Sequence, residues 1–233
     1  SFEKKYFEKE AVSCEFVGHP LLEKNVTAKI DINQIIGKNK AILSIFPGSR
    51  FSEINILMPI LLKFIELMKN KYNDITYVFH SRNEHRILIQ SFIDKSKLVN
   101  CGVISDDVVK QYVLNKSILA ISKSGTISLE ICNCKIPSII IYKMGFINFL
   151  IVKTLVKIKF ANIINIAANK IIIPELLQSK CNAKNIYDHV NDLLDNPDKI
   201  KNQVIQTEII LKSFKTKKPS AELTSESLNR FLH

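Results

Sequence analysis

The pattern of apolar and polar positions along residues 41–143 changes regularly between two types. Continuous apolar runs, several of them rich in β-branched residues, are typical of strands buried on both faces of a sheet. The longer stretches between them carry apolar residues at the three- and four-residue spacing of a helix, as at Ile54, Leu57 and Leu61. The predicted strands are residues 41–46, 75–80, 97–104, 118–122 and 137–143, and the predicted helices are 52–71, 84–95, 108–115 and 124–134.

This alternation predicts parallel strands joined by right-handed crossovers, with helices on both faces of the sheet. The expected fold class is therefore α/β, a Rossmann-like doubly wound parallel sheet with a helical C-terminal extension. The helices predicted after the sheet are 174–178, 183–194, 198–212 and a last short helix. Pro174 stands at the start of the first of these, a position that proline favours.

The chain divides into three predicted parts. Residues 1–30 form a separate N-terminal piece, in which the run CEFVGHPL predicts one short strand and a turn. Residues 31–197 form the α/β lobe, and residues 198–233 form the C-terminal helices.

Residues 146–160, FINFLIVKTLVKIKF, are strongly apolar but contain Lys153, Lys157 and Lys159. A helix that crosses a bilayer needs about 20 apolar residues, so this segment is too short and too rich in lysine to span one. Two interpretations remain. The segment is either an interfacial helix with its lysines toward anionic headgroups, or a helix packed on the lobe with its lysines solvated.

The composition is that of a globular protein, because 46% of the 233 residues are apolar and 24% are charged. The net charge of +11 favours anionic partners, although a chain this rich in Ile, Lys and Asn is also what an AT-rich genome would encode. Without a helix-turn-helix, an RNP-like aromatic pattern or zinc-ligand spacing, nucleic acid is not an expected partner. No basic-then-apolar leader opens the sequence.

Five cysteines are scattered along the chain, an odd number without metal-ligand spacing. We expect free thiols that are buried as small apolar side chains in a reducing cytoplasm. The five are Cys14, Cys101, Cys132, Cys134 and Cys181.

Candidate binding residues follow the predicted strands, because open α/β sheets bind ligands at the carboxyl ends of their strands. Gly48, Ser49 and Arg50 follow the first strand and lead into a helix. Glycine permits close approach of the backbone, a helix N-terminus offers free N–H groups, and the arginine fork matches phosphate oxygens. Most glycine turns before helices bind nothing, so this loop alone is a weak signal.

A second loop, Ser124, Gly125 and Thr126, repeats the arrangement after the fourth strand, with Glu130 one helical turn further on. Two hydroxyls and a glycine at a helix start suit a pyrophosphate, and the glutamate suits ribose hydroxyls. The same residues are also ordinary helix caps. Neither loop is a Walker A motif or a G-x-G-x-x-G motif, which argues against ATPase and dinucleotide-binding functions.

Several stretches together resemble the lipid-A-disaccharide synthase family, bacterial glycosyltransferases of GT-B architecture. They are FVGHPL (16–21), FPGSR followed by Glu53, KSGTISLE (123–130), IIYKM (140–144) and IIIPELLQ (171–178), in the family's order and spacing. The resemblance spans nearly the whole chain and corresponds to the C-terminal, nucleotide-sugar-binding part of these enzymes. The opening SFEKKYFEKE is similar to the end of their N-terminal lobe.

The resemblance implies transfer of an acylated glucosamine from its UDP conjugate to an acylated glucosamine 1-phosphate, with inversion and release of UDP. No metal or other cofactor is implied, since helix ends and basic side chains would stabilise the departing diphosphate. The implied diphosphate contacts are Gly48, Ser49, Arg50, Ser124, Gly125, Thr126 and Asn165. Glu130 is implied at the ribose, and Tyr142, Lys143 and Met144 are implied at the uracil.

The family resemblance further implies a cytoplasmic protein docked on the inner membrane, because its substrates are lipids. The C-terminal helices would brace the other lobe or pack on a partner subunit, as in a homodimer. The acceptor pocket and the catalytic base belong mainly to the other lobe, so we expect this polypeptide alone not to turn over. A non-catalytic or degenerate lobe, or another GT-B UDP-sugar enzyme such as an epimerase, remains an alternative.

The chain departs from the family pattern at residues 163–170, which read IINIAANK where the family has Leu-Pro-Asn-Leu followed by Ala-Gly-Arg. Lys170 replaces the arginine and cannot make its planar bidentate contact, and Lys143 also stands where arginine is usual. No catalytic base is identified among the histidines. His19 is expected at an interlobe hinge, and surface or packing roles are expected for His80, His85, His189 and His233.

Overall fold

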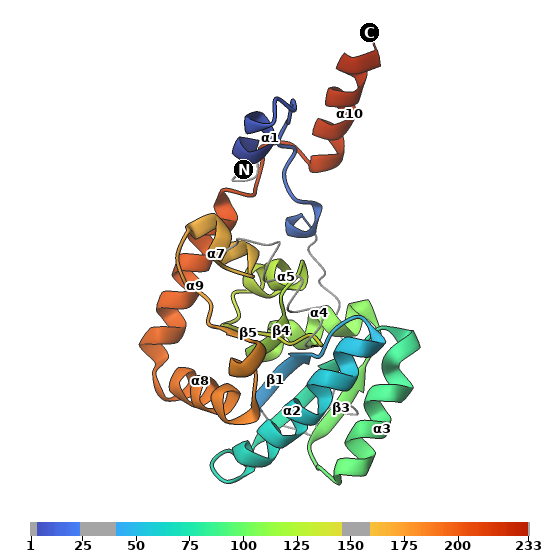
Figure 1. The fold of residues 1–233 in the computed structure, drawn as a ribbon, viewed down its shortest axis with the longest axis vertical. Coiled ribbons are helices and arrows are strands. Elements are labelled where there is room, and N and C mark those ends of the chain that lie inside the picture. Colours follow the sequence, from blue (N-terminus) through green and yellow to red (C-terminus); the bar gives the residue numbers. More distant parts are fainter. Residues whose placement is uncertain (1–3, 24–40, 146–158, 233) are drawn as a thin grey trace.

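The computed structural model describes residues 4–23, 41–145 and 159–232, and a six-stranded parallel sheet lies at its centre (Figure 1). The strands are β1 (Ala41–Phe46), β2 (Ile75–His80), β3 (Cys101–Ile104), β4 (Ser117–Lys123), β5 (Ser138–Tyr142) and β6 (Glu175–Leu177). They pair in the order β3-β2-β1-β4-β5-β6. This is the doubly wound order, whose direction reverses between β1 and β4. The predicted fold class is confirmed, and β1 and β2 have the predicted bounds.

Helices cover both faces of the sheet, as the alternation predicted. Successive side chains of a strand point to opposite faces, so Leu43 and Ile45 of β1 pack in one core while Ile42 and Phe46 pack in two smaller clusters on the other face. The first face carries α2 (Phe51–Lys69), α3 (Arg86–Ser96) and α8 (Ala183–Asp195). The second carries α4 (Asp107–Lys116), α5 (Ile127–Asn133), α7 (Ile163–Ala168) and the C-terminal part of α9 (Pro197–Lys212).

The helix predicted at residues 174–178 is wrong. Glu175–Leu177 forms β6, which pairs in parallel with the open edge of β5, and a 3-10 turn follows at Gln178–Lys180. The main-chain N–H of Ile140 reaches the carbonyl of Pro174, and Leu176 is buried in the main core. An unpaired strand edge and an apolar pocket for Leu176 therefore outweigh the local helix signal of a Pro-Glu-Leu-Leu-Gln run.

The short strand predicted within residues 14–21 is also wrong. No strand occurs between residues 4 and 23, where the structure shows α1 (Lys4–Lys9) and a 3-10 turn at Pro20–Leu22. The Nδ1 atom of His19 accepts a hydrogen bond from the N–H of Leu21 and caps this turn. The apolar residues of this segment have no neighbouring strand to pair with, and an isolated extended segment is not stable as a strand.

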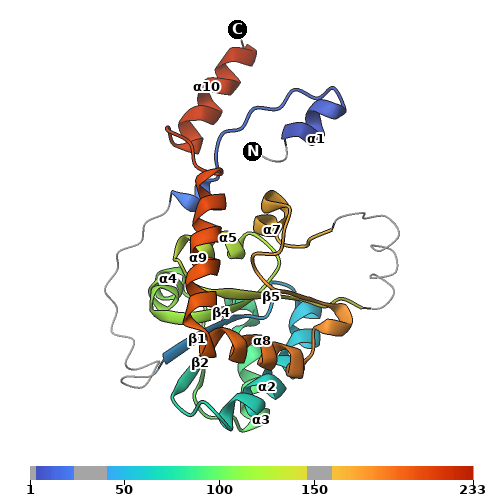
Figure 2. The ribbon, with the colours of Figure 1, turned by 90° about the vertical axis from the view of Figure 1, so that its left-hand side faces the viewer.

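The two terminal segments lie on the same side of the sheet, where α1 and α10 (Ser220–Leu232) project from the lobe (Figures 1 and 2). Glu15 accepts hydrogen bonds from Ser227 and Arg230, and Glu23 accepts one from the N–H of Ser220. Contacts across about 200 positions therefore join the N-terminal segment to the last helix.

No helix among the described residues is long and apolar enough to cross a membrane. The two interpretations of residues 146–160 concern a segment that lies outside the described residues, apart from its last two positions. All five cysteines are free thiols, as predicted. The predicted burial is right for Cys132 and Cys181 and wrong for Cys14, Cys101 and Cys134, which are partly exposed.

Candidate functional site

A cavity of about 430 Å³ opens at the carboxyl ends of β1, β2 and β4, where the strand order reverses. Doubly wound sheets bind their ligands at this switch point. The lining residues are Phe46, Gly48, Ser49, His80, Ser81, Arg82, Asp107, Lys110, Lys123, Ser124, Gly125, Thr126, Ile127 and Glu130. The structure thus brings together both glycine loops and Glu130, which the sequence analysis selected separately.

The first loop, between β1 and α2, is shaped by contact between Gly48 and Glu53. Gly48 has a φ of +124°, and a Cβ atom there would lie 2.7 Å from Oε2 of Glu53. The same oxygen accepts the N–H of Ser49 at 3.1 Å, and Oε1 accepts a hydrogen bond from Arg50 at 3.0 Å. Arg50 does not line the cavity; its side chain is 74% exposed and tethered beside it by this ion pair.

Glu53 also binds Lys123, the last residue of β4, whose Nζ lies 2.5 Å from Oε1. Burial opposes ionisation of Glu53, but hydrogen bonds from Lys123 and Ser49, and the charge of Lys123, outweigh it and lower the pKa of the carboxyl. Neither residue is among the site residues predicted from the sequence. Lys123 stands at the end of an apolar strand and beside a glycine loop, which is the signal that could have selected it.

The second loop, between β4 and α5, faces open space. A Cβ atom on Gly125 would meet no atom within 4 Å. The hydroxyl of Ser124 donates to the carbonyl of Ala161, and that of Ser128 donates to the carbonyl of Gly125. Ser124 therefore anchors the loop to residues near α7 and leaves the cavity side of Gly125 accessible to a ligand.

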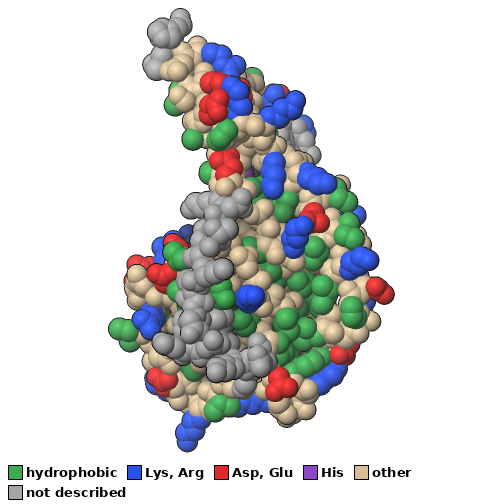
Figure 3. Space-filling model, turned by 180° about the vertical axis from the view of Figure 1, so that it is seen from behind, with side chains coloured by type: hydrophobic (Ala, Val, Ile, Leu, Met, Phe, Trp, Pro, Cys, Tyr) green, Lys and Arg blue, Asp and Glu red, His purple; other side chains and the backbone are tan. Residues whose placement is uncertain are grey.

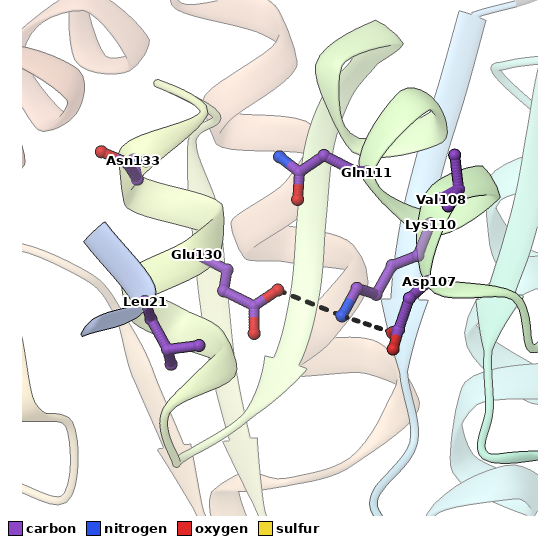
Figure 4. Close-up of a pocket in the computed structure, with 7 residues that line it drawn as sticks. All are labelled: Leu21, Asp107, Val108, Lys110, Gln111, Glu130 and Asn133. Atoms are coloured by element: carbon purple, nitrogen blue, oxygen red, sulfur yellow. Dashed lines mark ion pairs between the residues drawn. The ribbon is translucent and has the colours of Figure 1, made fainter. Parts of the chain in front are cut away.

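Glu130 is held by an ion pair that joins α5 to α4. Nζ of Lys110 lies 3.2 Å from Oε2 of Glu130 and 3.0 Å from Oδ1 of Asp107 (Figure 4). Burial works against the charged amine, yet Asp107 and Glu130 raise the pKa of Lys110. These three residues also line a smaller adjoining pocket of about 130 Å³, to which Leu21 of the N-terminal segment contributes. The pair fixes the direction of the Glu130 carboxylate in the cavity wall.

His80, at the end of β2, is a buried residue of the cavity wall. Its ring stacks on Phe46 with centroids 4.1 Å apart and an interplanar angle of 8°. Nε2 lies 2.8 Å from Oγ of Ser44, which lies 2.7 Å from Oγ of Ser117. Burial, with a smaller contribution from Lys110, lowers the pKa of His80 to about 3, so the ring is neutral. This is the packing role that the sequence analysis expected.

Besides Arg50, two groups of predicted site residues do not line this cavity. Tyr142, Lys143 and Met144 are not among its lining residues, and Tyr142 instead lies under Lys123, with Nζ 5.0 Å from the ring centroid. Asn165 is fully buried. Its amide binds the backbone of Ile173 and the carboxylate of Glu175, so a contact with a ligand would have to replace these bonds.

The remaining histidines lie at the margin of the site or elsewhere. Nε2 of His85 is 3.3 Å from the carbonyl of Ser49 and from Oε1 of Glu84, and His189 is exposed on α8. His233 lies outside the described residues. No group of three or more His, Cys, Asp or Glu in the described part of the chain could hold a metal ion.

The arrangement suits a polyanionic ligand with a hydroxylated part. Basic side chains of Arg50, Lys123 and Lys110 surround two loops that allow close backbone approach, and Glu130 offers an acceptor for hydroxyl groups. Such preorganised donors can stabilise negative charge that develops on a leaving group.

Solved structures with similar folds come from nucleotide-sugar enzymes. A Staphylococcus aureus protein solved with UDP, MnaA, superposes with a TM-score of 0.67 at 15% identity, over 98% of this chain and 57% of that one. A glycosyltransferase from Rickettsia africae superposes with a TM-score of 0.55 at 13% identity, over 98% of this chain and 51% of that one. These structures share the fold of this chain, a Rossmann-like doubly wound lobe of the GT-B type.

Sequence relatives identify the particular family. The family model for lipid-A-disaccharide synthetase matches residues 1–227. The lipid-A-disaccharide synthase of Rickettsia prowazekii is 35% identical over 214 residues, covering 90% of this chain and 56% of that protein, and that of Rickettsia conorii is 34% identical over 230 residues, covering 97% and 51%. The chain belongs to the lipid-A-disaccharide synthetase family, and it spans about half the length of these curated relatives.

Proposed function

We propose that this chain supplies the UDP-binding lobe of a lipid-A-disaccharide synthase. The complete enzyme would transfer an acylated glucosamine from its UDP conjugate to an acylated glucosamine 1-phosphate, with inversion and release of UDP. The observation that carries the proposal is the convergence of the two glycine loops, Lys123 and Glu130 on one cavity at the switch point of the sheet. The family membership of the chain supports the choice of substrate class.

The proposed orientation of UDP follows from the order of polar groups along the cavity wall. The diphosphate lies between the loop at Gly48 and the loop at Gly125, where backbone and cations meet. Glu130 then accepts ribose hydroxyls, and the base extends toward α4 and His80. In this proposed orientation the uracil does not contact residues 142–144, because none of them lines the cavity and the Tyr142 ring packs against Lys123.

In the proposed mechanism this lobe accelerates transfer by stabilising the departing UDP. Negative charge develops on the diphosphate as the bond to the sugar breaks, and cations already held in position interact with it without reorganising. Acceptor binding and proton removal from the attacking hydroxyl would belong to the other lobe. The chain alone should therefore bind UDP and form no disaccharide.

Calorimetric titration with UDP tests the donor-site proposal. We expect micromolar binding, weakened tenfold or more, or about 1.4 kcal/mol, by Arg50→Ala. Arg86→Ala is the matched control, because Arg86 is exposed on α3, whereas Arg50 is held beside the cavity by its ion pair with Glu53. The proposal fails if UDP binds neither to this chain nor to a polypeptide extended to the length of the relatives. Disaccharide formation by the 233-residue chain would contradict the proposed division of labour.

We also propose that the complete enzyme works at the cytoplasmic face of the inner membrane, where acylated substrates are located. The net charge of +11 supports attraction to an anionic surface. Apolar side chains gather on the face seen in Figure 3, with Lys and Arg side chains around them. Co-sedimentation with vesicles of 30% anionic lipid should exceed that with neutral vesicles and should fall at 0.5 M salt; equal sedimentation in all three would contradict the proposal.

A further inference from the structure

Lys123 is held in a fixed position in the cavity wall from two sides. Its ammonium lies 2.5 Å from Oε1 of Glu53 and 5.0 Å from the centroid of the Tyr142 ring. Carboxylates and the faces of aromatic rings both attract cations. The side chain is only 17% exposed, and the residue lines the cavity. An ammonium group has three N–H donors, so the bond to Glu53 leaves donors for a ligand.

Glu53 connects the two glycine loops through this lysine. One carboxylate oxygen accepts the N–H of Ser49, and the other accepts hydrogen bonds from Arg50 and Lys123. Its side chain is 12% exposed and fills the space beside Gly48 that any larger residue would need. The loop after β1 and the end of β4, 70 positions apart, are thereby fixed relative to each other.

The charge balance at this point favours an anion. Two cations share one carboxylate, which leaves one net positive charge where the two loops meet. Lys123 is only 17% exposed, so its attraction to a phosphate is screened less than at an open surface, whereas Arg50 is 74% exposed. The cations are already oriented, so a phosphate would not have to immobilise a free lysine side chain.

We propose that Lys123 is a further diphosphate-binding residue and that Glu53 is its positioning residue, so that both loops act on the ligand as one unit. This inference rests on the proposed function, because it assigns Lys123 to the same UDP site. An ion pair that merely stabilises the fold would affect every ligand of the cavity alike. The proposed pair acts on the diphosphate and leaves the nucleoside part unaffected.

Calorimetric titrations with UDP and with uridine separate these two cases. We expect Lys123→Met to weaken UDP binding tenfold or more and to leave uridine affinity within twofold, while Lys123→Arg keeps UDP affinity within threefold of the wild type. Lys63→Met, an exposed lysine on α2, is the matched control and should change neither affinity. Equal losses for UDP and uridine, or no loss of UDP affinity, would overturn the role of Lys123.

The positioning role of Glu53 is tested with Glu53→Gln and the double variant. Glu53→Gln should weaken UDP binding at least threefold, and the loss in the double variant with Lys123→Met should be smaller than the sum of the two single losses, because part of the effect of the carboxylate passes through the lysine. Additive losses would contradict this role.

Backbone hydrogen exchange tests the positioning role of Glu53 independently of the proposed UDP site. Both Lys123→Met and Glu53→Gln should speed exchange of the N–H groups of residues 48–50, although Lys123 belongs to β4 and not to this loop. Unchanged exchange there overturns the positioning role, whether or not UDP binds. If neither this chain nor the polypeptide extended to the length of the relatives binds UDP, the proposed function fails and the ligand role of Lys123 fails with it.

Discussion

Nδ2 of Asn165 donates a hydrogen bond to Oε1 of Glu175 at 2.7 Å, and this contact joins α7 to the edge strand β6. Oδ1 of Asn165 accepts the N–H groups of Ile172 and Ile173. The Glu175 carboxylate also accepts the N–H groups of Ala161 and Asn162. The segment that departs most from the family pattern is thus held by a buried hydrogen-bond network.

Asn165→Ala should lower the free energy of unfolding by about 2–4 kcal/mol, because it leaves buried N–H groups and a carboxylate without their partner. Urea denaturation measures this loss. Asn55→Ala is the control, since the Asn55 side chain bonds to a carbonyl on an exposed helical turn and its removal should cost less than about 0.5 kcal/mol. Unchanged stability together with lost UDP binding would instead indicate direct contact with the donor.

Gly48→Ala should destabilise the chain by about 1–3 kcal/mol. The φ of +124° is unfavourable for alanine, and the new Cβ atom would lie 2.8 Å from Cβ of Glu53. Gly145→Ala provides the comparison, because a Cβ atom there meets nothing within 4 Å, and its effect should stay within about 0.5 kcal/mol. Equal stability of the two variants would show that the loop relaxes around Gly48.

His80 should make the folded chain less stable in mild acid. Burial lowers the pKa of His80 to about 3, whereas an unfolded histidine has a pKa near 6.5, so the unfolded state binds the extra proton first as pH falls. The contribution is complete above pH 6.5 and decreases toward pH 3. It amounts to a loss of about 2 kcal/mol between pH 7.5 and pH 5.

Urea denaturation at both pH values measures this loss, which His80→Gln should remove and the exposed-site variant His189→Gln should leave in place. The chemical shifts of the His80 ring provide a second check on wild-type protein. They should stay constant between pH 7.5 and pH 5, and a titration within that range would contradict the burial argument.

Cys132 and Cys181 should resist thiol reagents in the folded chain. Burial raises the pKa of Cys132 to about 12 and that of Cys181 to about 11, so neither forms appreciable thiolate at pH 8. Mass spectrometry after brief treatment with a disulfide reagent should find both unmodified. All five cysteines should react in 6 M guanidinium, and rapid modification of Cys132 without denaturant would refute its burial.

Much of the fold could be predicted because the information is local. A run such as Ala41–Phe46 is buried on both sides, so nearly every position must be apolar, and the bounds of β1 follow directly. The two glycine loops were selected by the same reasoning, since parallel strands present their carboxyl ends at one edge. The ordered set of family motifs predicted the class of reaction, glycosyl transfer, which neither glycine loop alone could indicate.

The tertiary structure decided features that depend on partners distant in the sequence. Residues 174–178 read as a helix by composition, and only the open edge of β5 makes Glu175–Leu177 a strand. The family resemblance implies that Asn165 contacts the diphosphate, and only the fold shows that its amide also bonds Ile173 and Glu175. Glu53 and Lys123 have no periodic relationship over 70 positions, yet neighbouring strands bring them into contact. Local pattern determines most of the elements that form, whereas contacts between elements decide the edge strand β6 and determine which polar groups remain for a ligand.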